Sequence, residues 1–205
     1  MGALKEGSIE ELEYYIGNSK SLIRQLNLMK IDGSLDIKIG VVNRKQYKNI
    51  VNYLYKRKTI NKVLKSDAIL TGSKSLSLVT INGLDVIRRD VSYSDWDFLT
   101  TEKNLYNVSK NLEKPKKTTA SKLTFRISDS DSYGSGGVDM DLIVKSEETP
   151  FIINSQGYRI SDPIYIIGEK IKLVESYLNK SRDRFFNKHF EDIKDFSLLF
   201  QHLDI

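Results

Sequence analysis

Two acidic pairs are the residues of this sequence best suited to chemistry. Asp95 and Asp97 form the first pair and Asp139 and Asp141 the second, each with one apolar residue between its members. In a β-strand, residues i and i+2 point to the same face, so each pair would place both carboxylates on one side of a sheet. Carboxylate oxygens are the ligands that Mg²⁺, Mn²⁺ and Ca²⁺ prefer.

A divalent cation would offset the repulsion among these four acids. Like charges close together repel one another, and a bound metal ion removes that cost. The same alternation of polar and apolar residues is ordinary on the wet face of a half-exposed sheet. Either pair by itself therefore fits both interpretations.

A Gly-Ser turn ahead of the first pair favours a metal and nucleotide site. The stretch AILTGSKS, residues 68–75, contains a short apolar strand, then Gly72 and Ser73, then the start of a helix. Glycine lets the backbone approach a ligand closely, and free amides at a helix start favour phosphate. A turn for triphosphate beside carboxylates for metal is what phosphoryl or nucleotidyl transfer requires.

These residues resemble the nucleotidyltransferase superfamily, the fold shared by polymerase beta and many bacterial transferases. Its signature is a strand, Gly-Ser or Gly-Gly, a helix, Asp-x-Asp, and a third acid on a later strand. The stretch LTGSKSLSLVTINGLDVIRRDVSYSDWDF is most similar to the abortive-infection and toxin–antitoxin branch, in which the interval before Asp-x-Asp is longer. The resemblance runs from Ile69 to Leu203. The N-terminal stretch has no counterpart in it, and the loop DSDSYGSGG lengthens the turn before the third acid.

The resemblance implies three catalytic acids. Asp95, Asp97 and Asp139 would hold two Mg²⁺ ions that bridge the phosphates of an NTP and the attacking group, and Asp139 would help to deprotonate an acceptor hydroxyl. Asp141 is the alternative third metal ligand. Asp139 is preferred because apolar residues flank it on both sides, as in the family.

The resemblance also implies a set of nucleotide-binding residues. Gly72 and Ser73, with the adjacent Lys74, would hold the triphosphate. Lys170, on a later helix, would neutralise phosphate charge. The alternative for Lys170 is a solvated lysine on a helix surface.

The C-terminal segment carries two supporting acids. In the family branch, a lysine in one helix is followed by a basic residue and Asp-x-x-Asp in the next helix. Here the lysine would be Lys170, the basic residue Lys188, and the two acids Asp192 and Asp195. Alternatively, the two aspartates cap a helix or pair with nearby lysines such as Lys194.

The elements that must position these residues predict an α+β fold, in which a small mixed sheet is flanked by N-terminal and C-terminal helices. Helical periodicity favours helices over 8–30, broken or bent around Gly17, and over 44–66, 73–79, 164–180 and 185–203. Short β-like runs predict strands over 68–71, 94–100, 122–128 and 138–144. We expect an N-terminal helical region at 1–66, a nucleotidyltransferase-like core at 67–160, and C-terminal helices packed on the core at 161–205.

Composition limits the other classes. The 205 residues are 40% hydrophobic, enough for a substantial core, and contain no cysteine, which excludes disulfides and thiolate metal sites. The net charge of +5 permits contact with nucleic acid without requiring it. The sequence has no signal-peptide pattern and no apolar run of membrane-spanning length, so we expect a cytoplasmic protein without a membrane partner.

The expected function is Mg²⁺-dependent transfer of a nucleoside monophosphate from an NTP to a hydroxyl on a protein, an RNA end or a small molecule. One alternative is a non-catalytic module of the same fold that acts as a structural or interaction component of a larger, for example phage, assembly. Another is a nucleic-acid-binding surface on the lysine-rich stretch 56–65, which would make binding steeply dependent on salt.

Overall fold

The computed structural model describes residues 8–39, 58–91, 94–110, 112–127, 138–155, 157–178 and 186–203. Within these residues the fold is α+β, with six helices and two sheets, which confirms the predicted class. None of the described helices is both long and apolar enough to cross a membrane.

The chain divides into two compact units. The helical unit comprises Met1–Val42, Val79–Arg89 and Pro163–Ile205, and the sheet unit comprises Asn43–Leu78 and Asp90–Asp162. The helical unit therefore joins the N-terminal and C-terminal helices, which the sequence analysis had assigned to separate regions.

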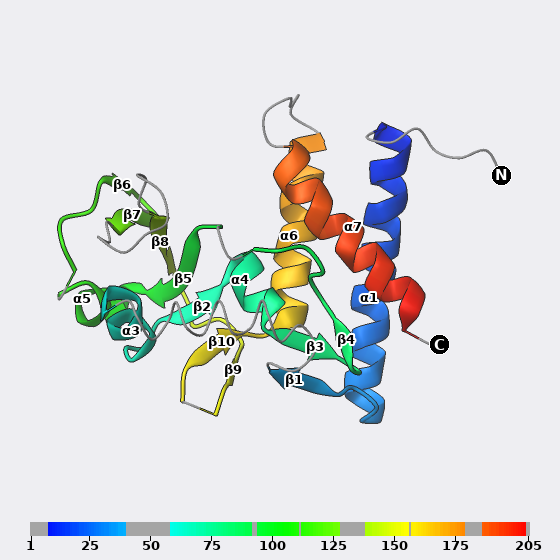
Figure 1. Ribbon diagram of the computed structural model, residues 1–205, viewed down its shortest axis with the longest axis horizontal. Coiled ribbons are helices and arrows are strands. Elements are labelled where there is room, and N and C mark those ends of the chain that lie inside the picture. The colour runs from blue at the N-terminus through cyan, green and yellow to red at the C-terminus, as the bar shows by residue number, and fades with distance from the viewer. Residues whose placement is uncertain are drawn as a thin grey trace. The chain divides into compact units, whose positions relative to one another are not determined.

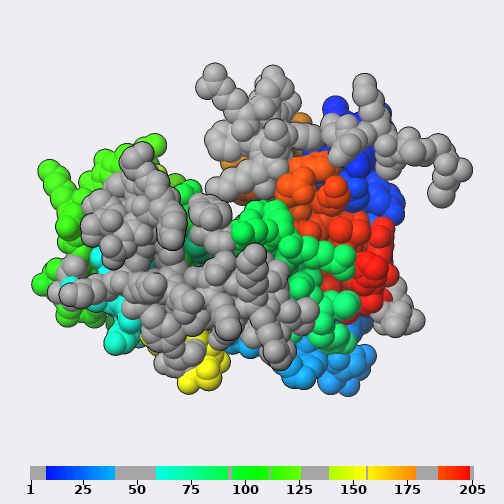
Figure 2. All heavy atoms as spheres, viewed as in Figure 1, coloured from blue at the N-terminus to red at the C-terminus, as the bar shows by residue number. Residues whose placement is uncertain are grey.

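The helical unit is built on three helices, α1 (Ile9–Asp32), α6 (Pro163–Leu178) and α7 (Phe186–His202). They lie side by side in Figure 1, and in the space-filling view the atoms of α7 lie directly against those of α1 (Figure 2). The unit also contains a three-stranded antiparallel sheet in the order β1-β3-β4. Its strands are β1 (Ile37–Ile39), β3 (Val79–Ile81) and β4 (Leu84–Asp85).

Helix α1 shows how local signals and packing act together. Its N-terminus is capped by Ser8, whose Oγ accepts the backbone N–H of Glu11 at 3.1 Å, and it ends at Gly33 in the left-handed conformation. The predicted break at Gly17 is wrong, because the helix continues through this exposed residue. Glycine costs a helix about 1 kcal/mol, and burial of one apolar stripe on both sides of it outweighs that cost. The stripe consists of Leu12, Ile16, Leu22 and Leu26.

The sheet unit contains a seven-stranded mixed sheet in the order β6-β7-β8-β5-β2-β10-β9. Strands β5 and β8 are parallel, as are β2 and β10, and the other pairs are antiparallel. The strands are β2 (Ile69–Thr71), β5 (Trp96–Thr101), β6 (Lys117–Thr119), β7 (Lys122–Ile127), β8 (Val138–Lys145), β9 (Phe151–Ile153) and β10 (Arg159–Ser161). Three helices accompany them: α3 (Lys58–Leu64), α4 (Gly72–Ser77) and α5 (Glu102–Ser109).

All four predicted strands are present, as β2, β5, β7 and β8. The prediction of a helix over 73–79 is partly wrong, because α4 ends at Ser77 and the chain then forms the hairpin β3–β4. Asn82 and Gly83 at its turn both have positive φ, as the tightest hairpin turns require. Of the helix predicted over 44–66, the part before Lys58 lies outside the described residues, and the rest contains α3.

One face of the sheet is the core of this unit. Trp96 and Phe98 on β5 lie opposite Met140 and Leu142 on β8, and all four side chains are almost fully buried. Complete burial of such a side chain stabilises a fold by about 1.5–3 kcal/mol relative to exposure. This face fixes which way the intervening residues point, and those residues are the acids.

Candidate active site

One row of side chains crosses four adjacent strands of the seven-stranded sheet. Asp97 on β5 lies opposite Asp141 on the parallel strand β8 and opposite Thr71 on the antiparallel strand β2. Asp141 in turn lies opposite Thr124 on β7. Residues paired in register share a face, so these four side chains lie on one side of the sheet.

The other two acids lie at the start of the same two strands. Asp95 immediately precedes β5 and is exposed, and Asp139 is the second residue of β8 and is partly exposed. Trp96 and Met140, which separate the members of each pair, are buried on the opposite face. The structure thus brings both predicted pairs to the N-terminal ends of two neighbouring parallel strands.

The Gly72 turn lies directly beside Asp97. Strand β2 ends at Thr71, the register partner of Asp97, and Gly72 follows with φ +73°. A Cβ atom at Gly72 would lie 2.5 Å from Asp97 Oδ2, closer than carbon and oxygen approach without a shift. Glycine is therefore required here both by its left-handed backbone and by the carboxylate next to it. Ser73, the next residue, is buried in α4.

Gly72→Ala should destabilise the protein by about 2 kcal/mol, from the left-handed backbone and the displaced carboxylate. Urea unfolding measures this change. Gly17→Ala is the matched control, since that glycine is helical and has open space around its Cβ position. The control should raise stability by about 0.5–1 kcal/mol. Equal effects of the two substitutions would contradict this role of Gly72.

Lys74 is buried and makes contacts within the sheet unit. Its side chain is only 1% exposed, and its Nζ donates to the backbone carbonyls of Val91, at 3.1 Å, and of Ser94. The ammonium also lies 4.7 Å from the centre of the Trp96 ring. These contacts tie α4 to the segment that leads into Asp95. Lys74 is thus a structural contact between the two motifs, and its contact with nucleotide stays a prediction.

The acidic face is the side of the sheet that carries Asp95, Asp97, Asp139 and Asp141. Lys122 also lies there and was not identified from the sequence. Its Nζ donates to Asp141 Oδ2 at 2.8 Å, and the Thr124 hydroxyl donates to Asp141 Oδ1 at 2.6 Å. The hydrogen bond to Asp141 raises the pKa of Lys122, and the charges of Asp141, Asp97 and Asp95 act in the same direction. The only available signal was that Lys122 and Thr124 alternate along a predicted strand, and nothing in the sequence fixed the register of that strand.

The four acids offer the oxygen ligands that Mg²⁺ prefers, but the contacts of Asp139 and Asp141 differ from those expected in the predicted two-ion site. Their oxygen donors are of the right type, and Asp95 and Asp97 lie two residues apart at the start of β5. Both oxygens of Asp141 already accept hydrogen bonds, and Asp139 lies 3.7 Å from Lys116 Nζ. Among the described residues, no three histidines, aspartates or glutamates gather as a group that could hold a metal ion. A divalent ion at these acids stays a prediction.

Lys170 and Asp192 belong to the helical unit and contact each other. Lys170 Nζ on α6 lies 2.5 Å from Asp192 Oδ2 on α7, and Arg89 Nη2 contacts the other oxygen of the same carboxylate. The Asp192 side chain is 1% exposed. Burial would raise the pKa of Asp192, but the charges of Lys170 and Arg89 outweigh it and lower the pKa. Asp192 thus pairs with Lys170 and Arg89, and a contact of Lys170 with nucleotide stays a prediction.

Asp195, one turn further along α7, has the opposite electrostatic balance. Its Oδ2 accepts the backbone N–H of Arg88 at 3.3 Å, and the residue is 8% exposed. Burial raises the pKa of Asp195 from 3.8 to about 6, although the hydrogen bond from Arg88 and the charge of Arg89 oppose the change. The folded protein therefore holds this proton more tightly than the unfolded chain does.

Asp195→Asn should make the protein more stable at pH 7.5 and flatten its pH profile. Because the folded-state pKa is raised, the wild type should lose stability as the pH rises from about 4 to about 6. A shift of this size corresponds to about 3 kcal/mol, and partial solvent screening reduces the expected gain to about 1.5 kcal/mol. Urea unfolding between pH 4 and pH 7.5 measures both effects. A variant that kept the wild-type slope would contradict the assignment to Asp195.

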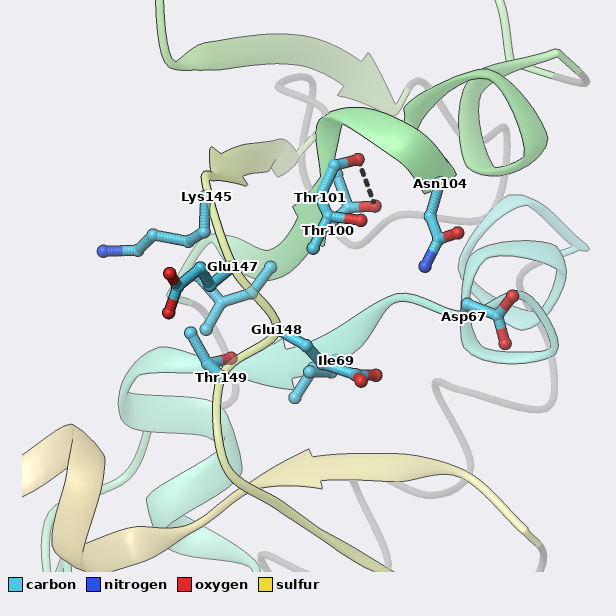
Figure 3. Close-up of a pocket in the computed structure, with 10 residues that line it drawn as sticks. Asp67, Ile69, Thr100, Thr101, Asn104, Lys145, Glu147, Glu148 and Thr149 are labelled. Carbon is cyan, nitrogen blue, oxygen red and sulfur yellow. Dashed lines mark hydrogen bonds between the residues drawn. The ribbon is translucent and has the colours of Figure 1, made fainter.

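A small hollow lies elsewhere on the sheet unit (Figure 3). Its lining includes Ile69, where β2 begins, and Leu99, towards the end of β5. Gly72 and Asp97 lie at the opposite ends of these strands, so this hollow is not the site of the acids. Its other lining residues are Asp67, Thr100, Thr101, Asn104, Lys145, Glu147, Glu148 and Thr149.

Comparison with known proteins finds no matching family model, curated protein or solved structure. The geometry of the acids and of the Gly72 turn is therefore the basis for a proposed function.

Proposed function

We propose that the protein is a nucleotidyltransferase that moves a nucleoside monophosphate from an NTP to a hydroxyl acceptor. The acceptor class is a protein side chain, an RNA end or a small molecule. The site consists of Asp95 and Asp97, the second pair Asp139 and Asp141, and the turn at Gly72.

The observation that carries the proposal is the meeting of three separate segments at one end of one sheet. Asp97 lies opposite Asp141 on one side and opposite Thr71, at the mouth of the Gly72 turn, on the other. These segments are far apart in the sequence, and each is one part of the signature seen in it. Ordinary alternation of polar and apolar residues on a solvent-exposed face explains acids on a strand. It gives no reason for a glycine with a left-handed backbone to pack against one of them.

The proposed reaction is a substitution at the α-phosphorus of the NTP. The acceptor oxygen forms a bond to that phosphorus, the bond to the bridging oxygen breaks, and pyrophosphate leaves with its electron pair. Asp139 takes the proton of the acceptor hydroxyl and passes it to solvent. The backbone at Gly72, which has no side chain to obstruct it, lets the phosphates approach Asp97. A divalent ion bound by Asp95 and Asp97 would supply positive charge to the phosphates.

One observation favours the non-catalytic alternative, in which this fold is a structural or interaction module of a larger assembly. The described acids do not form a three-ligand metal group, and Asp141 is engaged by Lys122 and Thr124. A module without chemistry would have no need to assemble one. An assay of label transfer from NTP decides between the two functions.

The assay incubates the purified protein with each α-³²P-labelled NTP and Mg²⁺, alone and with cell extract. A nucleotidyltransferase would transfer label to protein, RNA or a small molecule, and the gel or chromatographic position of the label identifies the acceptor class. The double variant Asp95→Ala, Asp97→Ala is the negative control. Absence of transfer from all four NTPs, together with absence of metal-dependent NTP binding, would support the non-catalytic module.

A further inference from the structure

The acidic face contains a cation of its own. Lys122 lies on β7, on the same face as Thr124, and its ammonium lies 2.8 Å from Asp141 Oδ2. The carboxylates of Asp97 and Asp95 also attract this ammonium. Lys122 is 40% exposed at its side chain and Asp141 is 16% exposed, so the pair lies at the boundary between the sheet and solvent.

The same contacts leave Asp141 poorly placed to bind a metal ion. Thr124 occupies one carboxylate oxygen and Lys122 the other, so the orientation of the carboxylate is fixed from both sides. A Mg²⁺ ion binds an oxygen ligand at about 2.0–2.1 Å. An ion at that distance from Oδ2 would be close to the ammonium, and the two positive charges would repel each other.

We propose that Lys122 takes the place of one of two divalent ions, so that the site binds a single ion, through Asp95 and Asp97. This inference rests on the proposed function for the identity of the site. Lys122 neutralises Asp141 and adds a fixed positive charge beside the region where the phosphates of the NTP would lie. It is thus a positioning residue for the acids, and the acidic face needs one metal ion fewer than four carboxylates suggest.

The stoichiometry of Mn²⁺ binding tests this proposal. Electron paramagnetic resonance of free Mn²⁺ during titration should give one bound ion per wild-type chain. Lys122→Met should expose Asp141 and create a second site, or tighten Mn²⁺ binding at least tenfold. Lys122→Arg keeps the charge and should give one ion, like the wild type.

Two further variants separate the proposed cause from loss of any surface lysine. Lys122→Met combined with Asp141→Asn should return the stoichiometry to one ion, because the oxygen released by the first change is no longer charged. Lys103→Met, on the exposed surface of α5, should leave binding unchanged. Circular dichroism checks that each variant is folded.

The outcomes distinguish this inference from the proposed function. Two Mn²⁺ ions on the wild type with label transfer retained would overturn the role of Lys122 alone. Unchanged binding in a folded Lys122→Met variant would do the same. Absence of both Mn²⁺ binding and label transfer in the wild type would overturn both proposals, whereas one ion without transfer would overturn only the enzymatic function.

Discussion

Asp97→Asn should lower the rate of nucleotidyl transfer by at least about a hundredfold to a thousandfold, the cost of removing one group that stabilises the charge of a transition state. Asp97 has register partners on both sides, Asp141 and Thr71. It is also the one that lies against the Gly72 turn. The substitution preserves the shape of the side chain and removes its charge.

The fold should survive this change, because Asp97 is only partly buried and its backbone pairing is unaffected. Initial rates of label transfer, at saturating NTP and with the acceptor identified in the assay, measure the effect. Asp36→Asn, at an exposed position in the helical unit, is the matched control and should retain the wild-type rate. A folded Asp97→Asn protein with more than a tenth of wild-type activity would contradict the proposed site.

The acidic face could be predicted from the sequence because its signals are local. Alternation around Trp96 and Met140 determines which residues of β5 and β8 face the core, and burial of those residues turns the acids to the other side. The order of the two strands in the sheet is not local. Their parallel pairing, which places Asp97 opposite Asp141, depends on how the intervening chain folds back.

The uses of Lys74 and Lys122 could not be predicted for the same reason. A lysine after a Gly-Ser turn is expected to contact phosphate, but Lys74 is buried and donates to the backbone carbonyls of Val91 and Ser94. Lys122 contacts Asp141 only because β7 pairs with β8 in one register, and a slip of one residue would turn it to the other face. Long-range pairing decides both cases.

The hairpin β3–β4 was not predicted from the sequence, for a different reason. Its first strand, Val79–Ile81, continues an apolar run that begins in α4, so the spacing of apolar residues is compatible with a longer helix. The turn residues Asn82 and Gly83 are the local signal that would have identified it. Pairing of β3 with β1, which lies more than thirty residues earlier, then stabilises the strand.

Asp192→Asn should destabilise the protein by about 3–5 kcal/mol, the cost of breaking a buried ion pair from one side. Lys170 and Arg89 contact opposite oxygens of the Asp192 carboxylate, and that carboxylate is almost completely shielded from water. The asparagine would leave two positive charges close together around a neutral group. Because these contacts join α6 and α7 to Arg89 in the segment Val79–Arg89 of the same unit, their loss should lower the stability of the whole helical unit.

Urea unfolding at pH 7 measures this loss, and Glu191→Gln is the matched control. Glu191 is the neighbouring residue of α7 and is exposed, so its neutralisation should change stability by no more than about 0.5 kcal/mol. Combining Asp192→Asn with Lys170→Met should cost less than the sum of the two single changes, because the second removes one of the charges left without compensation. Additive effects, or an Asp192→Asn protein as stable as the control, would show that the carboxylate does not hold this cluster together.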